Sequence, residues 1–236
     1  MVDRIAKEKL NIILLIDASR SMSGRRISQV DRAIADIQAY LKDFQNENTN
    51  VDFFLTLVPF SNDASFYNDK VSVPIDEFAY KGIKCGGYSN LHCAYERLGE
   101  IMKKESKGGI MPDFGGPAPI ILLLTDGHPT GQTYKKRLEE ISEIPWFKAA
   151  LRYGIAIELD DKRTVKVLSD FVGSNGDVIS CYDAGMLKDI IKVIVLTASK
   201  VKSSGSKIAS GPHVSQNLFA RQMIAEALSD VESSGW

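Results

Sequence analysis

The sequence has few of the residues that build disulfide frameworks and soft-metal clusters. Its 236 residues include only three cysteines and three histidines. Cys85, Cys93 and Cys181 form an odd, widely spaced set, which matches neither a disulfide framework nor a zinc-ligand spacing. We therefore interpret the cysteines as small apolar residues of the interior.

Long apolar runs and an excess of charge of one sign are also lacking. The longest apolar runs, residues 12–16 and 120–124, are far shorter than the roughly 20 residues that a transmembrane helix needs. Residues 1–11 are charged and lack the apolar core of a signal peptide. The net charge is −1, from 29 basic and 30 acidic residues, so no basic surface for nucleic acid is indicated. We expect a cytoplasmic protein that binds neither membranes nor nucleic acid.

Sequence motifs of the common nucleotide-dependent and hydrolytic enzymes are missing as well. The chain has no glycine-rich phosphate loop, dinucleotide fingerprint, kinase signature or nucleophile elbow. Of the three histidines, His92, His128 and His213, only His128 lies close in sequence to a strand-terminal aspartate, and we interpret it as a loop residue. A metal-bound water beside Asp126 could hydrolyse a bond, but no general base accompanies it. We therefore predict that the chain is not an enzyme.

The sequence does contain a regular alternation of apolar segments and helical patterns. Residues 11–17, 51–60 and 119–126 are typical of strands buried on both faces. Shorter strands are predicted at 70–75, 154–159 and 177–182. Helices are predicted at 27–44, 91–101, 134–144, 146–152, 163–172 and 184–200. This order predicts a Rossmann-like, doubly wound α/β fold with a mostly parallel sheet and helices on both faces.

The C-terminal part of the chain has a different composition. Residues 201–213 are rich in serine and glycine, as flexible linkers are. Over 214–236, apolar residues including Phe219 and Leu228 recur on one face of a predicted amphipathic helix. We predict a domain over 1–200, followed by the linker and this helix. The helix either folds back onto the domain or docks into a partner's groove.

Two of the predicted strands end in aspartate, at the edge of a parallel sheet where binding sites form. The spacing of Asp17, Ser19 and Ser21 places three oxygen donors on one side of a tight loop. Asp126 ends another strand, and Ser89 stands after two glycines at a predicted helix start, where its simpler alternative role is an N-cap. Mg²⁺ prefers about six oxygen ligands, and neutral hydroxyls leave much of its positive charge uncompensated. The pattern predicts a metal site for Mg²⁺, or for Mn²⁺ or Ca²⁺, that accepts an acidic group.

These motifs together resemble a known family. The Asp-x-Ser-x-Ser loop at 17–21, the Gly-Gly turn before Ser89 and the Thr-Asp-Gly sequence at 125–127 are similar to those of von Willebrand factor A (VWA) domains with a metal-ion-dependent adhesion site (MIDAS). The resemblance covers roughly residues 10–200. It implies that an acidic residue of a partner protein binds at the metal. It also implies that the metal is held by Asp17, Ser19, Ser21, Ser89 and Asp126.

Two positions depart from the family's pattern. Ser89 stands where threonine is usual, but it keeps the hydroxyl, so we expect metal binding to survive. Arg20 occupies a position that is often a small residue. It could clash with a docking partner or pair with an acidic one, and we interpret it as a solvated arginine that modulates binding.

The chain also resembles the bacterial TerY-like proteins of the tellurium-resistance group, through residues 125–130 and the serine-rich tail. This resemblance implies a role in tellurite or stress resistance, beside a protein kinase and a PP2C-type phosphatase. We predict a metal-dependent protein interaction module, expected to be a monomer. The alternatives are a metal-free scaffold that acts through its C-terminal helix and a metal-dependent hydrolase.

Overall fold

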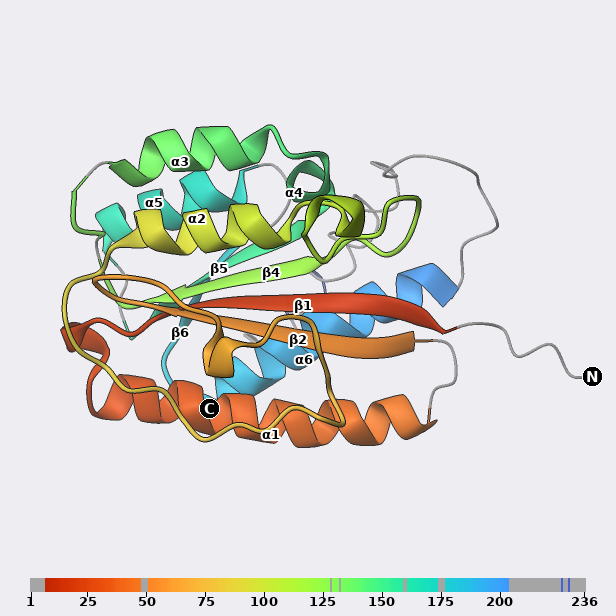
Figure 1. The fold of residues 1–236 in the computed structure, drawn as a ribbon. Coiled ribbons are helices and arrows are strands. Elements are labelled where there is room, and N and C mark those ends of the chain that lie inside the picture. Colours follow the sequence, from red (N-terminus) through yellow and green to blue (C-terminus); the bar gives the residue numbers. More distant parts are fainter. Residues whose placement is uncertain are drawn as a thin grey trace, which may run out of the picture.

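The structure is a three-layer α/β fold with one six-stranded sheet at its centre (Figure 1). The computed structural model describes residues 7–47, 51–127, 129–131, 133–158, 161–173 and 177–203, and the single residues 226 and 229. The strands are β1 (Glu8–Asp17), β2 (Val51–Phe60), β3 (Val73–Pro74), β4 (Ile120–Thr125), β5 (Leu151–Ile157) and β6 (Val178–Cys181). The helices are α1 (Arg25–Glu47), α2 (Leu91–Ile101), α3 (Thr133–Ser142), α4 (Pro145–Ala149), α5 (Lys162–Val172) and α6 (Ala184–Ser203). The predicted doubly wound α/β fold is confirmed.

The strand order places β1 and β4 side by side in the middle of the sheet. The order is β3-β2-β1-β4-β5-β6, and every pair is parallel except β2 and β3. Ile16 of β1 pairs with Pro59 of β2 on one side and with Leu124 of β4 on the other. The carboxyl ends of these three strands therefore meet at one edge of the sheet, on the left in Figure 1.

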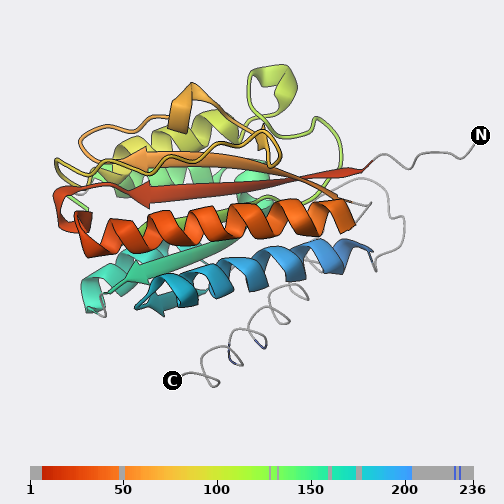
Figure 2. The same cartoon turned by 90° about the horizontal axis from the view of Figure 1, so that it is seen from below.

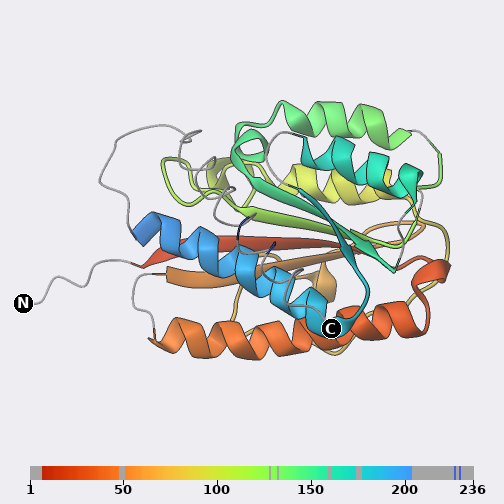
Figure 3. The ribbon, with the colours of Figure 1, turned by 180° about the vertical axis from the view of Figure 1, so that it is seen from behind.

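The apolar runs of the central strands form two cores, because successive side chains point to opposite faces of a strand. Ile12, Leu14 and Ile16 belong to one core, and Ile13 and Leu15 to the other, and none of them is more than 2% exposed. Helices α1 and α6 lie side by side over the first face (Figures 2 and 3). Helices α2, α3, α4 and α5 cover the second face. Burial on both faces explains why these strands lack alternating polar residues.

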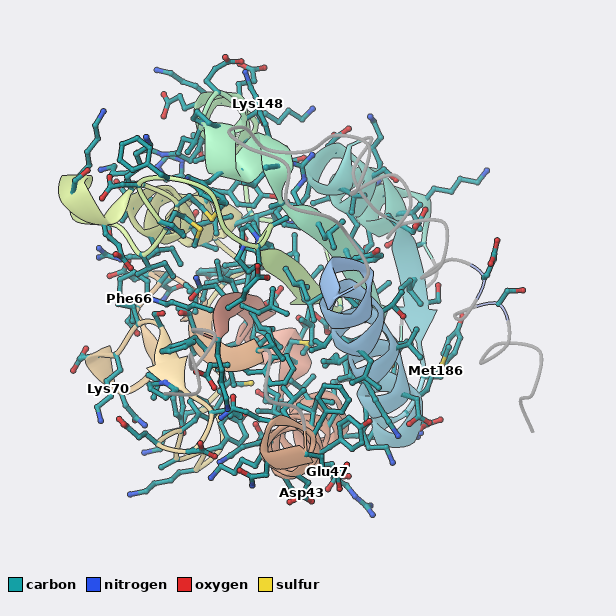
Figure 4. The ribbon with its side chains drawn as sticks, turned by 90° about the vertical axis from the view of Figure 1, so that its right-hand side faces the viewer. Asp43, Glu47, Phe66, Lys70, Lys148 and Met186 are labelled. Atoms are coloured by element: carbon teal, nitrogen blue, oxygen red, sulfur yellow. The ribbon has the colours of Figure 1, made fainter. Side chains whose placement is uncertain are left out.

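Helix α1 has a single apolar stripe that fits this arrangement. Its residues Ile27, Val30, Ile34, Ile37 and Leu41 are all buried. The helix runs away from the carboxyl edge of the sheet, so its last turns, with Asp43 and Glu47, lie at the opposite end of the molecule (Figure 4). The first turn of α1 therefore lies at the edge where the predicted site residues gather.

The strand predicted at 154–159 begins earlier in the structure, and the helix predicted at 146–152 is correspondingly shorter. Strand β5 begins at Leu151 and α4 ends at Ala149. Arg152, inside the strand, is only 8% exposed. Its guanidinium donates to the carbonyls of Phe147 at 2.7 Å and Val172 at 2.9 and 3.1 Å, and lies over the Phe147 ring. These contacts allow a charged residue inside a buried strand, which the sequence pattern did not indicate.

The strand predicted at 70–75 shrinks to Val73–Pro74, which pairs antiparallel with β2 at the edge of the sheet. The edge is the position in which a sheet tolerates proline, since proline lacks the N–H of a central strand.

The predicted linker over 201–213 and the predicted helix over 214–236 fall mostly outside the described residues. The exceptions are residues 201–203, which belong to α6, and Glu226 and Ser229, which are exposed helical positions. None of the helices that the structure describes is both long enough and apolar enough to cross a membrane.

Candidate metal centre

Three loops meet at the carboxyl edge of the central strands. The loop after β1 contacts the glycine turn before α2, because the Arg20 amide donates to the Gly87 carbonyl at 3.1 Å and the Gly86 amide donates to the Ala18 carbonyl at 2.8 Å. The loop after β4 joins them, since the Thr130 amide donates to the Ser89 carbonyl at 2.7 Å. These backbone hydrogen bonds fix the relative positions of the side chains on the three loops.

Gly87 is required in this turn by both its conformation and its surroundings. Its φ of +77° is rarely adopted by other residues. A Cβ atom there would also lie only 2.7 Å from the side chain of Asn62. The Asn62 carboxamide oxygen in turn accepts from the Tyr88 amide at 2.8 Å, which ties the turn to the loop after β2.

Asp17 is a fully buried carboxylate held by neutral donors. Its Oδ1 accepts from the Ser19 amide at 2.9 Å. Its Oδ2 accepts from the Ser89 hydroxyl at 2.8 Å and the Thr125 hydroxyl at 2.7 Å. The loop after β1, the loop before α2 and the end of β4 therefore converge on this carboxylate.

Asp126 is the second buried carboxylate, and its partners differ from those of Asp17. Its Oδ1 accepts from the Ser21 hydroxyl at 2.8 Å, and the Ser21 and Ser19 hydroxyls lie 3.1 Å apart. Its Oδ2 forms a short ion pair with Nη1 of Arg26. Neutral hydrogen-bond donors thus stabilise the charge of Asp17, whereas the charge of Asp126 is paired with the positive charge of Arg26.

The five residues predicted to hold a metal therefore lie together in one hydrogen-bonded cluster. Asp17, Ser19 and Asp126 are buried, Ser89 is half-buried and Ser21 is exposed, so the cluster reaches solvent on the side of Ser21. We call this group the oxygen cluster; its members are Asp17, Ser19, Ser21, Ser89 and Asp126.

Three further expectations can be compared with the structure. The N-cap alternative for Ser89 is wrong, because the cap of α2 is Asn90 and the Ser89 hydroxyl donates to Asp17. Arg20 is exposed, as expected. His92 lies on α2 with Nδ1 3.4 Å from the Thr133 carbonyl oxygen, and His128 and His213 lie outside the described residues.

Sequence reasoning missed two residues that contact the oxygen cluster. The sequence identifies Thr125 only as part of a motif, yet its buried hydroxyl donates to Asp17. Arg26 was not predicted at all as a neighbour of Asp126. The predicted helix at 27–44 begins one residue after Arg26; the structure places Arg26 in the first turn of α1, where the helix dipole disfavours a positive charge.

Arg26 belongs to a wider ion-pair network with Glu158, which directly follows β5. Arg26 Nε lies 3.5 Å from Glu158 Oε2, while Arg25 Nε and Gln29 Nε2 lie 2.9 and 2.7 Å from Glu158 Oε1. Arg26 also donates to the Ser21 carbonyl at 3.2 Å. One guanidinium thus connects the loop after β1, Asp126 and Glu158.

An open cavity of about 340 Å³ adjoins the cluster on the β2 side. It is lined by residues 61–65 of the loop after β2, by Pro59 and Phe60 of β2, by Ala18 of the first loop and by Lys84. Cys85 follows Lys84, and the pKa of its thiol is raised to about 11 by burial and by the nearby carboxylates of Asp31, Asp17 and Asp126.

The donor set suits a hard divalent cation. The cluster supplies two carboxylates and three hydroxyls, and oxygen is the ligand that Mg²⁺, Mn²⁺ and Ca²⁺ prefer. Within the ranges that the structure describes, no group of three or more histidine, cysteine, aspartate or glutamate side chains is placed to hold a metal. A site here would depend on serine hydroxyls as much as on charge.

Comparison with known proteins gives a distant relative in sequence. Mouse inter alpha-trypsin inhibitor heavy chain 4 is 29% identical over 130 residues, which cover 52% of this chain and 13% of that protein. The corresponding bovine protein is 28% identical over 138 residues, 56% of this chain and 14% of the relative. The chain therefore matches only a small part of these relatives, and no protein-family model matches it.

Solved structures match more of the chain. The ArnB paralog VWA2 of Sulfolobus acidocaldarius has a TM-score of 0.55 at 20% identity, covering 78% of this chain and 44% of that one. A von Willebrand factor type A protein of Catenulispora acidiphila has a TM-score of 0.57 at 13% identity, covering 82% and 43%. Proximal thread matrix protein 1 of the mussel byssus, described with a zinc-occupied MIDAS motif, has a TM-score of 0.56 at 16% identity, covering 82% and 48%. The chain therefore has the fold of von Willebrand factor A domains.

Proposed function

We propose that the oxygen cluster binds a divalent cation, and that the protein uses this cation to bind an acidic side chain of a partner protein. The observation that carries the proposal is the convergence of three loops, with two buried carboxylates and three hydroxyls in one hydrogen-bonded group. The residues that would hold the cation are Asp17, Ser19, Ser21, Ser89 and Asp126.

The chemistry of the cluster favours capture of an anion over a closed structural site. Three of the five proposed ligands are neutral, and the charge of Asp126 is already shared with Arg26. A bound Mg²⁺ or Mn²⁺ would supply positive charge that a partner's carboxylate can neutralise. Exposed Ser21 provides access from solvent. The zinc-occupied MIDAS motif of the mussel byssus protein supports a divalent ion in this fold.

An interaction module fits the cluster better than an enzyme. The side chains of the cluster and those hydrogen-bonded to it are aspartate, serine, threonine and arginine, and the described residues place no imidazole or amine among them. Hydrolysis by metal-bound water would need a group that accepts a proton near neutral pH. Both carboxylates are already engaged by several donors.

The biological setting is a further part of the proposal, and its resistance role and its kinase and phosphatase partners rest on the sequence resemblance alone. It comprises a cytoplasmic monomer in a bacterial tellurite- or stress-resistance system, working with a kinase and a PP2C-type phosphatase. The cytoplasmic setting is supported by free thiols at Cys85, Cys93 and Cys181.

One observation favours the alternative of a metal-free scaffold. The ion pair between Arg26 and Asp126 neutralises the second carboxylate without any metal. The metal-dependent module binds a carboxylate at the loops only when a divalent cation is present. The metal-free scaffold does not need the cation.

A titration with acetate tests the proposed function, with acetate as a probe for a partner's carboxylate. In NMR spectra of the ¹⁵N-labelled protein with Mg²⁺, we expect acetate to shift the backbone amides of Ser19, Ser21 and Ser89. These shifts should be absent in EDTA and in the Ser19→Ala/Ser21→Ala variant, with sodium chloride as the ionic-strength control. Equal shifts with Mg²⁺ and with EDTA, or no shift in either, would contradict the proposed function.

A further inference from the structure

The two buried carboxylates of the oxygen cluster are neutralised in different ways, and the difference needs a physical explanation. Asp17 accepts hydrogen bonds from one amide and two hydroxyls, all neutral. Asp126, whose side chain is fully buried, has the guanidinium of Arg26 on one oxygen. An isolated buried charge is costly, so the cluster without a metal needs this cation at Asp126.

The side chain of Arg26 is stabilised by its contacts with Asp126 and Glu158 and not by its place in α1. Arg25 and Arg26 both stand in the first turn of α1, which contains no acidic residue. The positive end of the helix dipole disfavours arginine at this place. Contacts with Asp126 and Glu158 offset that cost for Arg26.

Glu158 provides a second acceptor for the same guanidinium. Its Oε1 is occupied by Arg25 and Gln29, which leaves Oε2 facing Arg26 Nε at 3.5 Å. Glu158 also has a φ of +50°, which is strained for a residue with a side chain. Arg26 can therefore release Asp126 and keep an ion pair with Glu158.

We propose that Arg26 is a built-in competitor of the metal: it neutralises Asp126 when the site is empty of metal and must move toward Glu158 before Asp126 can serve a cation. This inference rests on the proposed function, because it concerns the same site. The consequences are a weaker affinity for the metal and a stable metal-free state. Coulomb repulsion between the guanidinium and a divalent ion also lowers the affinity for the metal.

Arg25 offers a matched control. It is the adjacent residue, carries the same charge and pairs with the same Glu158, but it does not contact Asp126 in the structure and its side chain is 75% exposed. Loss of either arginine removes one positive charge from the first turn of α1. Only loss of Arg26 frees Asp126.

Calorimetric titration of Mn²⁺ into the 236-residue protein and its variants tests the proposal. We expect Arg26→Ala to lower the Kd for Mn²⁺ by about fivefold or more, and Arg25→Ala to leave it within about twofold. In EDTA, Arg26→Ala should melt at a lower temperature than Arg25→Ala, because Asp126 loses its cation. Arg26→Gln provides a second variant in case Arg26→Ala does not fold.

A double-mutant cycle between Glu158 and Arg26 extends the same experiment. Glu158→Gln alone should weaken Mn²⁺ binding, because Arg26 loses the acceptor to which it would move. In the Arg26→Ala background the same change should have little effect on the Kd. Equal effects of Glu158→Gln in both backgrounds would contradict a role for Glu158 through Arg26.

The remaining outcomes separate this inference from the proposed function. Equal Mn²⁺ affinities of Arg25→Ala and Arg26→Ala, or a weaker affinity of Arg26→Ala than of the unmodified protein, would overturn the inference and leave the metal site standing. Mn²⁺ binding only after removal of Arg26 would support the inference strongly. Absence of binding in every variant would overturn both.

Discussion

At the scale of single residues, Asp17 is the point on which the loops converge. Three donors from the loop after β1, the loop before α2 and the end of β4 meet on its two oxygens. A buried carboxylate depends on such donors, because it has left water and has no alternative partners. Changes of the donors should therefore affect stability even when no metal is bound.

Thr125→Val tests this dependence, since valine keeps the shape of threonine and removes the hydroxyl, which donates to Asp17 and accepts from the Gly127 amide. We expect it to lower the free energy of unfolding by about 1–3 kcal/mol in EDTA, measured by urea denaturation. Thr133→Val, at an exposed position of α3, is the control and should change it by less than about 0.5 kcal/mol. A loss below about 0.5 kcal/mol for Thr125→Val would show that Asp17 does not need this donor.

The thiols are expected to react at different rates, for reasons that the structure specifies. Burial raises the pKa of the Cys181 thiol to about 12 and, with nearby carboxylates, that of the Cys85 thiol to about 11. Only the thiolate reacts, so a thiol of pKa 11 at pH 8 has roughly a hundredfold less reactive form than one of pKa 9.

Labelling with a disulfide reagent across pH 8–10 checks this expectation. Cys181, which is 1% exposed, should be labelled only after unfolding, and Cys85 should react slowly but faster as the pH rises toward 11. Cys85→Ala and Cys181→Ala assign the phases. Rapid labelling of Cys181 in the native protein would contradict its buried position.

At the scale of elements, the central strands could be predicted and the start of β5 could not. Five-residue apolar runs that end at a polar residue are sufficient to identify β1 and β4, because both faces of these strands are buried. Arg152 interrupts the pattern at the start of β5. Its guanidinium donates three hydrogen bonds to backbone carbonyls of other segments. No local sequence pattern predicts that these segments lie beside Arg152.

The contact between β5 and α5 provides a test at this scale. A Cβ atom on Gly154 would lie 2.7 Å from Cβ of Leu168, so the strand and helix are in contact at this glycine. Gly154→Ala should lower the free energy of unfolding by about 1–3 kcal/mol, because overpacking forces the two elements apart. Differential scanning calorimetry in EDTA can measure the change.

Gly86→Ala is the matched control for this prediction. Its added Cβ would meet no atom within 4 Å, and its φ is not positive. It should therefore unfold close to the temperature of the unmodified protein. Equal destabilisation by both substitutions would show that the contact with α5 does not explain the effect.

At the scale of the whole molecule, the sequence could predict which loops carry oxygen donors but not every group that contacts them. Parallel strands ending at one edge bring Asp17 and Asp126 together, and this follows from the alternation of strands and helices. The pairing of Arg26 with Asp126 joins residues 100 positions apart and depends on the orientation of α1. No local pattern contains that orientation, which is why this neighbour was missed.

The proposed division of the chain into a domain, a linker and a terminal helix can be tested by truncation. All six strands, and helices α1 to α6 as described, lie within residues 8–203. We expect a protein ending at Ser203 to unfold in one cooperative transition and to respond to Mg²⁺ as the full chain does. Loss of the cooperative transition would show that the remaining residues are part of the core.

Thermal unfolding with and without divalent cations is the most direct test that the oxygen cluster is a metal site. A cation at about 100 times its Kd should stabilise the protein by roughly 2.7 kcal/mol, which for a chain of this size raises the Tm by roughly 5–10 °C. We expect a rise of this order with millimolar Mg²⁺ or Mn²⁺ relative to EDTA, and none in the Ser19→Ala/Ser21→Ala variant. The same Tm in EDTA and in metal, or an equal rise in the variant, would contradict a metal site at these serines.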